Sequence, residues 1–217
     1  MPAAAGWAVS SRGIGAICIM PIIGMLAGRI DNRLLIITGF VLFGVTSLWM
    51  GGLTLDISPT SLVLPIVFSG MASGMVFVPL STISVGTLKN EQIGNAAGLF
   101  NLMRNVGGGV GISMVNTLVA RHVQTHRAEL VGNMSPGTPA FENALKATQG
   151  AMSHFAPPNI AAQRAYGLLQ GTLEVQAAAF SYVDVFRDLA LACFACGLVV
   201  LLMKRVKSRK GAASVGH

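Results

Sequence analysis

One apolar stretch of the sequence carries polar side chains that could hydrogen-bond a small molecule inside a membrane. Asn101, Arg104 and Asn105 lie between residues 94 and 119, among Leu, Val, Ile and Met. On an insertion scale, one arginine near the centre of a membrane helix costs about 2.5–3.5 kcal/mol, whereas each Leu, Ile, Phe or Val returns about 0.3–0.6 kcal/mol. The apolar residues roughly offset the arginine but not the asparagines, so we expect this helix to avoid lipid on one side.

Helical spacing gathers the polar residues of this stretch on one side. At 100° per residue, six residues fall within about 60° of one direction and are called the polar face here. They are Gly98, Asn101, Arg104, Asn105, Gly108 and Asn116. Ionisable groups inside a membrane almost always face protein or a water-filled cavity. The polar face is therefore predicted to line a transport path or a seam between helices; the alternative is that Arg104 pairs with carbonyls or a carboxylate only to hold the helices together.

Residues of the preceding apolar stretch could complete such a path. Met71 and Met75 could line a cavity that adapts to varied apolar shapes, because thioethers are flexible and polarisable; ordinary packing accounts for them equally well. Small residues permit close helix crossings, and prolines permit bends. The residues predicted to do this are Pro65, Gly70, Gly74, Pro79, Gly107 and Gly111.

Three further groups could do chemistry, but a structural role suits each of them better. The glycine run that begins at Gly107 lacks the Gly-Lys-Ser/Thr of a phosphate-binding loop, which favours helix contact. Cys193 and Cys196 form a C-x-x-C inside an apolar run, where packing is the better interpretation. His122 and His126 are one helical turn apart and could hold a metal, but a solvated loop face is favoured. We predict no metal site, no cofactor and no enzymatic activity.

The composition places the chain in a membrane. Of 217 residues, 53% are apolar and only 11% charged, whereas a soluble domain has about 25% charged residues. Three cysteines do not make a disulfide framework. The net charge of +7 includes a basic run from Lys204 to Lys210, which indicates a juxtamembrane tail rather than a nucleic-acid interface.

Five apolar runs are long enough to cross a bilayer, at about 20 residues per span. They cover residues 13–27, 34–53, 62–86, 94–119 and 185–203. The sequence thus predicts an all-α integral membrane protein of about five transmembrane helices. Residues 1–120 would hold four of them, 121–184 a long extracytoplasmic loop with amphipathic helices at 140–152 and 160–182, 185–203 the last span, and 204–217 a basic cytoplasmic tail.

Charges in the short loops predict the orientation. Lys and Arg are retained on the cytoplasmic side of a membrane. Placing the loop from Arg29 to Arg33 inside also puts Lys89 and the basic tail inside. We expect a multi-pass protein of a bacterial cytoplasmic membrane, with its N-terminus outside and its C-terminus inside.

The loop at residues 24–33 resembles a known signature. Its sequence, G-M-L-A-G-R-I-D-N-R, is similar to the cytoplasmic-loop motif G-x-L-a-D-R-x-G-R-R of the major facilitator superfamily. The motif positions are Gly24, Gly28, Arg29, Asp31 and Arg33. Gly28 stands where the family usually has Asp, and Asp31 stands where it has Gly, so the charges are kept in a shifted register.

A longer resemblance is more discriminating. The segments F-V-P-L-S-T-I-S from Phe77 and G-N-A-A-G-L-F-N-L-M-R-N-V-G-G-G-V-G-I-S from Gly94, with the long loop that follows, are similar to the fourteen-span EmrB/QacA drug:proton antiporters. The resemblance implies that the five runs are spans ten to fourteen of such a protein. The first, third and fourth would border the central cavity, and the second and fifth would be peripheral.

The resemblance also implies what the chain would lack. In this family the proton-coupling carboxylate belongs to the N-terminal half, and none of the five runs has a carboxylate near its middle. We therefore interpret the chain as the C-terminal fragment of a proton-coupled multidrug efflux permease that exports amphipathic drugs or toxic small molecules. Its expected partners are the substrate, protons, lipid, the missing N-terminal half and a periplasmic membrane-fusion adaptor, with no nucleic acid. The alternative is a non-transporting membrane scaffold or remnant that binds such an adaptor.

Overall fold

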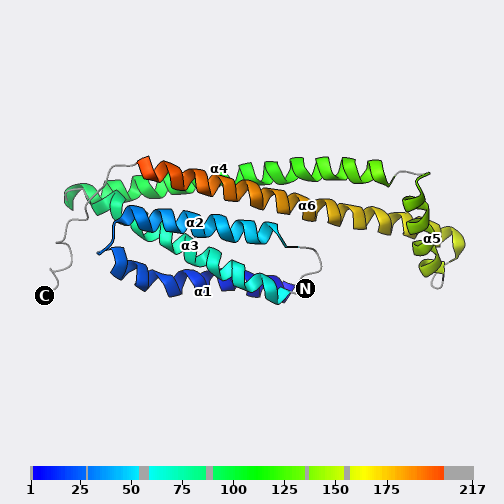
Figure 1. The fold of residues 1–217 in the computed structure, drawn as a ribbon, viewed down its shortest axis with the longest axis horizontal. Coiled ribbons are helices and arrows are strands. Elements are labelled where there is room, and N and C mark those ends of the chain that lie inside the picture. The colour runs from blue at the N-terminus through cyan, green and yellow to red at the C-terminus, as the bar shows by residue number, and fades with distance from the viewer. Residues whose placement is uncertain are drawn as a thin grey trace. The chain divides into compact units, whose positions relative to one another are not determined.

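The fold is built from α-helices. A computed structural model describes residues 2–27, 29–53, 59–86, 90–134, 137–153 and 157–202, and in these ranges every regular element is an α-helix (Figure 1). The helices are α1 (Pro2–Ala27), α2 (Asn32–Gly51), α3 (Pro59–Gly86), α4 (Asn90–Asn133), α5 (Pro139–Ser153) and α6 (Pro158–Leu202). The predicted all-α class is confirmed.

The chain divides into two compact units. The first unit comprises Met1–Ile112 and Phe186–His217, and the second comprises Ser113–Val185. Helices α4 and α6 each contribute to both units. The first unit holds α1, α2 and α3 with the first part of α4 and the last part of α6. The second holds the rest of α4, α5 and the first part of α6.

Three helical segments in the described part of the chain are long and apolar enough to cross a membrane. They are Asn32–Gly51, Thr60–Ser84 and Asn159–Leu202. The apolar segment of α1, Ser10–Leu26, is shorter. Helix α4 is not among the three, because its asparagines, arginine and glycines dilute its apolar residues. The second, third and fifth predicted spans therefore lie on suitable helices, whereas the first and fourth stay predictions.

Helices α4 and α6 are longer than the apolar runs within them. The fourth run ends near Val119 and the fifth begins near Val185, but α4 continues to Asn133 and α6 already begins at Pro158. No proline or glycine lies between residues 119 and 131, so nothing local ends α4 after its apolar run. In α6, Gly167 and Gly171 precede the apolar run, but isolated glycines weaken a helix without ending it. The transition from an apolar to a polar sequence marks where a helix could leave a membrane. Such a transition does not by itself end the helix. The range of helix α5, Pro139–Ser153, agrees to within one residue at each end with the amphipathic helix expected at 140–152.

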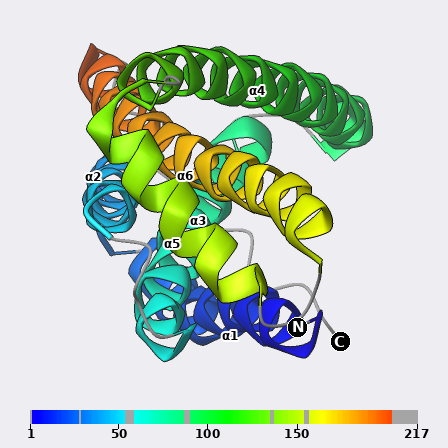
Figure 2. The same ribbon diagram turned by 90° about the vertical axis from the view of Figure 1, so that its right-hand side faces the viewer.

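The core of the first unit forms where α3 packs against α1 and α2 (Figure 2). Ile23 of α1 and Leu35 of α2 are buried together, with Met75 and Val78 of α3 packed on them. Pro65 and Pro79 lie inside α3 and are fully buried. Burial of a Leu or Ile side chain stabilises a water-soluble fold by about 1.5–3 kcal/mol. Inside a bilayer such contacts act through packing instead, because lipid tails are as apolar as the side chains.

Candidate functional site

An apolar cavity lies within the first unit. Its volume is about 490 Å³, which falls in the range of small-molecule sites, about 300–1,000 Å³. The lining residues come from α1, α2, α3, α4 and α6 and are nearly all apolar. They are Ala16, Met20, Phe40, Phe43, Ser73, Gly74, Val76, Phe77, Leu80, Arg104 and Cys193. Five helices thus line one open hollow that could accept an apolar organic molecule.

Arg104 gives this cavity its single charge among the described lining residues. Its guanidinium carbon lies 4.5 Å from the centre of the Phe77 ring, in cation–π geometry. The Phe77 ring in turn lies 6.3 Å from that of Phe100, tilted by 46°. A guanidinium over an aromatic ring is stabilised by about 0.5–2 kcal/mol, depending on how far it is desolvated. The ring positions the guanidinium at the cavity without neutralising it.

The rest of the polar face lies open. All six of its residues are exposed, and so are Leu102, Met103 and Val106 on the other side of α4, at 54–60%. An added Cβ at Gly107, Gly108 or Gly111 would meet nothing within 4 Å among the described residues. Within the described chain, α4 is therefore exposed on both sides here. If the polar face is covered in the assembled protein, the helix that covers it is not provided by the described part of this chain.

The two methionines lie apart from the cavity. Met75 packs against Ile23 and Leu35, and the lining residues of α3 are Ser73, Gly74, Val76, Phe77 and Leu80. Met71 is also absent from the lining. Packing therefore accounts for Met75, and the cavity lining is formed by the aromatic rings of Phe40, Phe43 and Phe77 and by a methionine of α1, Met20. The second apolar run, expected to be peripheral, contributes Phe40 and Phe43 to the cavity wall, and the fifth contributes Cys193.

Glycines of α3 bring its backbone against α1. A Cβ added at Gly70 would overlap the carbonyl oxygen of Arg12, and one added at Gly74 would lie 2.6 Å from Cγ2 of Ile19. Arg12 also donates a hydrogen bond from its guanidinium to Oγ of Ser73, at 3.4 Å. Arg12 was not among the residues predicted from the sequence, although a lone arginine between small and apolar residues is a signal of an interhelical contact.

The loop motif joins α1 to α2 and holds the end of α6. Nε of Arg33 donates a 2.8 Å hydrogen bond to the carbonyl oxygen of Val200, in the last turn of α6. The last four carbonyls of a helix lack intrahelical partners, so a cation there satisfies one of them and complements the helix dipole. Asp31 is the N-cap residue of α2, but its side chain makes no capping hydrogen bond. Gly24 and Arg29 are exposed, and Gly28 lies outside the described residues.

Comparisons with known proteins identify the class. The sequence profile of the Major Facilitator Superfamily matches residues 2–126, which is more than half of the chain. The chain therefore belongs to this superfamily of membrane transporters and is a multi-pass membrane protein with bacterial relatives. No solved structure gives a significant match.

The similar proteins are resistance and export proteins. The chain is 29% identical to the fatty acid resistance protein FarB of Neisseria gonorrhoeae over 84% of its length and 34% of that protein. It is 28% identical to the probable multidrug resistance protein EmrY of Escherichia coli K12 over 95% of its length and 39% of that protein. It is 31% identical to the multidrug export protein EmrB of Haemophilus influenzae over 64% of its length and 28% of that protein. The chain thus spans roughly a third of the length of the relatives it matches, and its kinship with EmrB-type efflux proteins is established.

Proposed function

We propose that this chain acts as the C-terminal portion of a proton-coupled efflux permease that exports amphipathic drugs or toxic small molecules. The observation that carries the proposal is the aromatic cavity with Arg104 at its wall. An apolar hollow with one cation fits a molecule that has an apolar body and a hydrogen-bond-accepting or acidic group. Two relatives are named for resistance to fatty acids and to multiple drugs, and a fatty acid combines an apolar body with an acidic group.

Further spans would supply the coupling machinery. In major-facilitator transporters two halves rock against each other around a site near the midplane of the bilayer. The exposed polar face of α4 is the surface on which we propose that the other half sits. The N-terminus would lie outside and the C-terminus inside a bacterial cytoplasmic membrane, with the motif at 24–33 as a cytoplasmic gating loop. A periplasmic membrane-fusion adaptor is the further partner we propose.

Drug-dependent proton flux in membrane vesicles tests this function. We expect no flux with the chain alone, because none of its apolar runs has a carboxylate near its middle. Co-expression with an N-terminal half from an EmrB-type relative should restore flux that depends on added drug. Equal amounts of inserted chain in both preparations serve as the control.

The same experiment separates transport from the scaffold alternative. A chain that recovers an adaptor protein in pull-downs, yet gives no drug-dependent flux with the N-terminal half present, would contradict the transport proposal and support a scaffold.

A further inference from the structure

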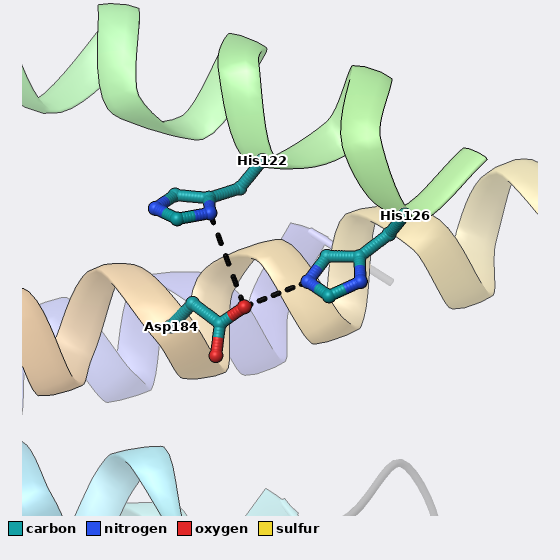
Figure 3. Close-up of side chains that lie close together, drawn as sticks. All are labelled: His122, His126 and Asp184. Atoms are coloured by element: carbon teal, nitrogen blue, oxygen red, sulfur yellow. Dashed lines mark hydrogen bonds and ion pairs between the residues drawn. The ribbon is translucent and has the colours of Figure 1, made fainter. Parts of the chain in front are cut away.

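A cluster of metal-binding side chains lies in the second unit, outside the proposed transport site. His122 and His126 project from α4 toward Asp184 of α6 (Figure 3). Nε2 of His126 lies 2.7 Å from Oδ2 of Asp184, and Nδ1 of His122 lies 3.9 Å from the same oxygen. All three side chains are partly buried, with 23–31% of their surface exposed. The cluster joins residues that are about 60 positions apart in the sequence.

The geometry of these atoms suits a small divalent ion. Zinc binds imidazole nitrogen and carboxylate oxygen at about 2.0–2.2 Å in tetrahedral sites, so its ligand atoms lie about 3.3–3.5 Å apart. The two nitrogen–oxygen distances, 2.7 and 3.9 Å, bracket this spacing. One ligand atom from each residue can be chosen so that all lie within 4.8 Å of one another. The ligand atoms lie at most 4.8 Å apart, so shifts of up to about one ångström would bring all three to this spacing, with a fourth position left for water.

A carboxylate behind His126 would orient the ring for this role. Oε2 of Glu129 lies 3.5 Å from Nδ1 of His126, on the opposite side of the ring from Asp184. Histidines that bind metals almost always donate their other ring N–H to a carboxylate, a carbonyl or water. With its proton on Nδ1, His126 presents the lone pair of Nε2 to the space beside Asp184. The spacing of His122 and His126, one helical turn apart, is the one that metal-binding helices use.

The helices that carry the ligands are fixed to each other next to the cluster. Oγ of Ser181 donates a 2.9 Å hydrogen bond to the carbonyl oxygen of Val119, and Ser181 is fully buried. Ser181 precedes Asp184 by three residues, and Val119 precedes His122 by three, so each lies on the same helix face as the ligand that follows it. The ring of Phe180, also on α6, lies 5.8 Å from that of His126, tilted by 45°. The ligands thus rest on a packed framework.

We propose that His122, His126 and Asp184 form a binding site for a zinc-like divalent transition-metal ion that fastens α4 to α6, with Glu129 orienting His126. Two imidazoles and one carboxylate suit Zn²⁺ rather than Mg²⁺ or Ca²⁺, which prefer oxygen ligands only. The inference is independent of the proposed transport function. The competing hypothesis is a set of metal-free hydrogen bonds and ion pairs among the same residues.

Cobalt spectroscopy of the whole chain tests the site directly. The chain, purified in detergent without a histidine tag, is titrated with Co²⁺ at neutral pH. We expect visible d–d absorption that saturates at one Co²⁺ per chain, is removed by Zn²⁺, and is unaffected by Mg²⁺. We also expect Zn²⁺ to raise the midpoint of thermal unfolding, because a ligand that binds only the folded state stabilises it. An absence of cobalt absorption in the unaltered chain would overturn the proposal without any variant.

Matched variants assign the ligands. His126→Gln and Asp184→Asn should weaken Co²⁺ binding at least tenfold, and Glu129→Gln should weaken it about 10–100-fold, as is usual for a residue that orients a ligand. Glu174→Gln is the control, because Glu174 pairs with Arg127 across the same two helices and lies outside the cluster. Circular dichroism confirms that each variant keeps its helical content. Unchanged cobalt absorption in folded His126→Gln would show that the ion binds elsewhere and would contradict the assignment.

Discussion

Replacing Arg104 by alanine should abolish drug export in the assembled transporter while leaving membrane insertion intact. The substitution removes the single charge among the described lining residues of the cavity and the guanidinium stacked on Phe77. It also makes insertion easier, because an arginine at the centre of a span is unfavourable by about 2.5–3.5 kcal/mol. We expect the rate of efflux to fall more than tenfold at an unchanged amount of protein in the membrane.

A second arginine on the same helix is the control for this experiment. Arg121 is exposed, belongs to the second unit and is not part of the cavity lining. Arg121→Ala should therefore export normally. Wild-type efflux by Arg104→Ala would remove Arg104 from the functional residues and leave it a structural role at most.

A large loss of stability is expected when Gly70 is replaced by alanine. In Gly70→Ala the new methyl group would overlap the carbonyl oxygen of Arg12, which is a backbone atom and can move only if α1 moves. Overpacking of this kind costs about 1–3 kcal/mol. The loss weighs heavily in a membrane, where helix association depends on close van der Waals packing. The midpoint of thermal unfolding in detergent should fall clearly.

The neighbouring helix offers a matched glycine. Gly13 follows Arg12 on α1, and a Cβ there would meet no atom of the described residues within 4 Å. Gly13→Ala should leave the unfolding midpoint unchanged or raise it, because alanine favours a helix over glycine by about 1 kcal/mol. Equal midpoints for the Gly13 and Gly70 variants would contradict the close contact between α1 and α3.

Sequence periodicity was sufficient to predict the helical class and three helices that are long and apolar enough to cross a membrane, because an uncharged apolar run of about 20 residues is typical of a membrane helix. It also singled out Arg104, since a charge inside such a run stands out. The cavity wall was harder to predict. Phe40, Phe43 and Cys193 look like ordinary residues of apolar runs, and only the packing of α2 and α6 within the first unit brings them to the same hollow. Their role is a property of tertiary structure.

The histidine pair shows a similar limit. Its spacing placed His122 and His126 on one helical face but gave no sign that Asp184 would lie opposite. Residues 121–184 were expected to form a loop, so nothing in the sequence brought α4 and α6 together there. The continuous helices α4 and α6 supply that proximity, and with it a candidate metal site in place of the solvated face that was expected.

The accessibility of residue 105 to a lipid-phase probe tests the central proposal most directly. In a cysteine-free background, Asn105→Cys on the polar face is compared with Met103→Cys, which lies about 160° away around α4 at 100° per residue, in the assembled and active transporter. We predict that a membrane-dissolved thiol reagent labels position 103 rapidly and position 105 at least tenfold more slowly, because a partner helix or the substrate path covers the polar face. Equal labelling of both positions would show that lipid surrounds α4 on all sides and would contradict the proposal.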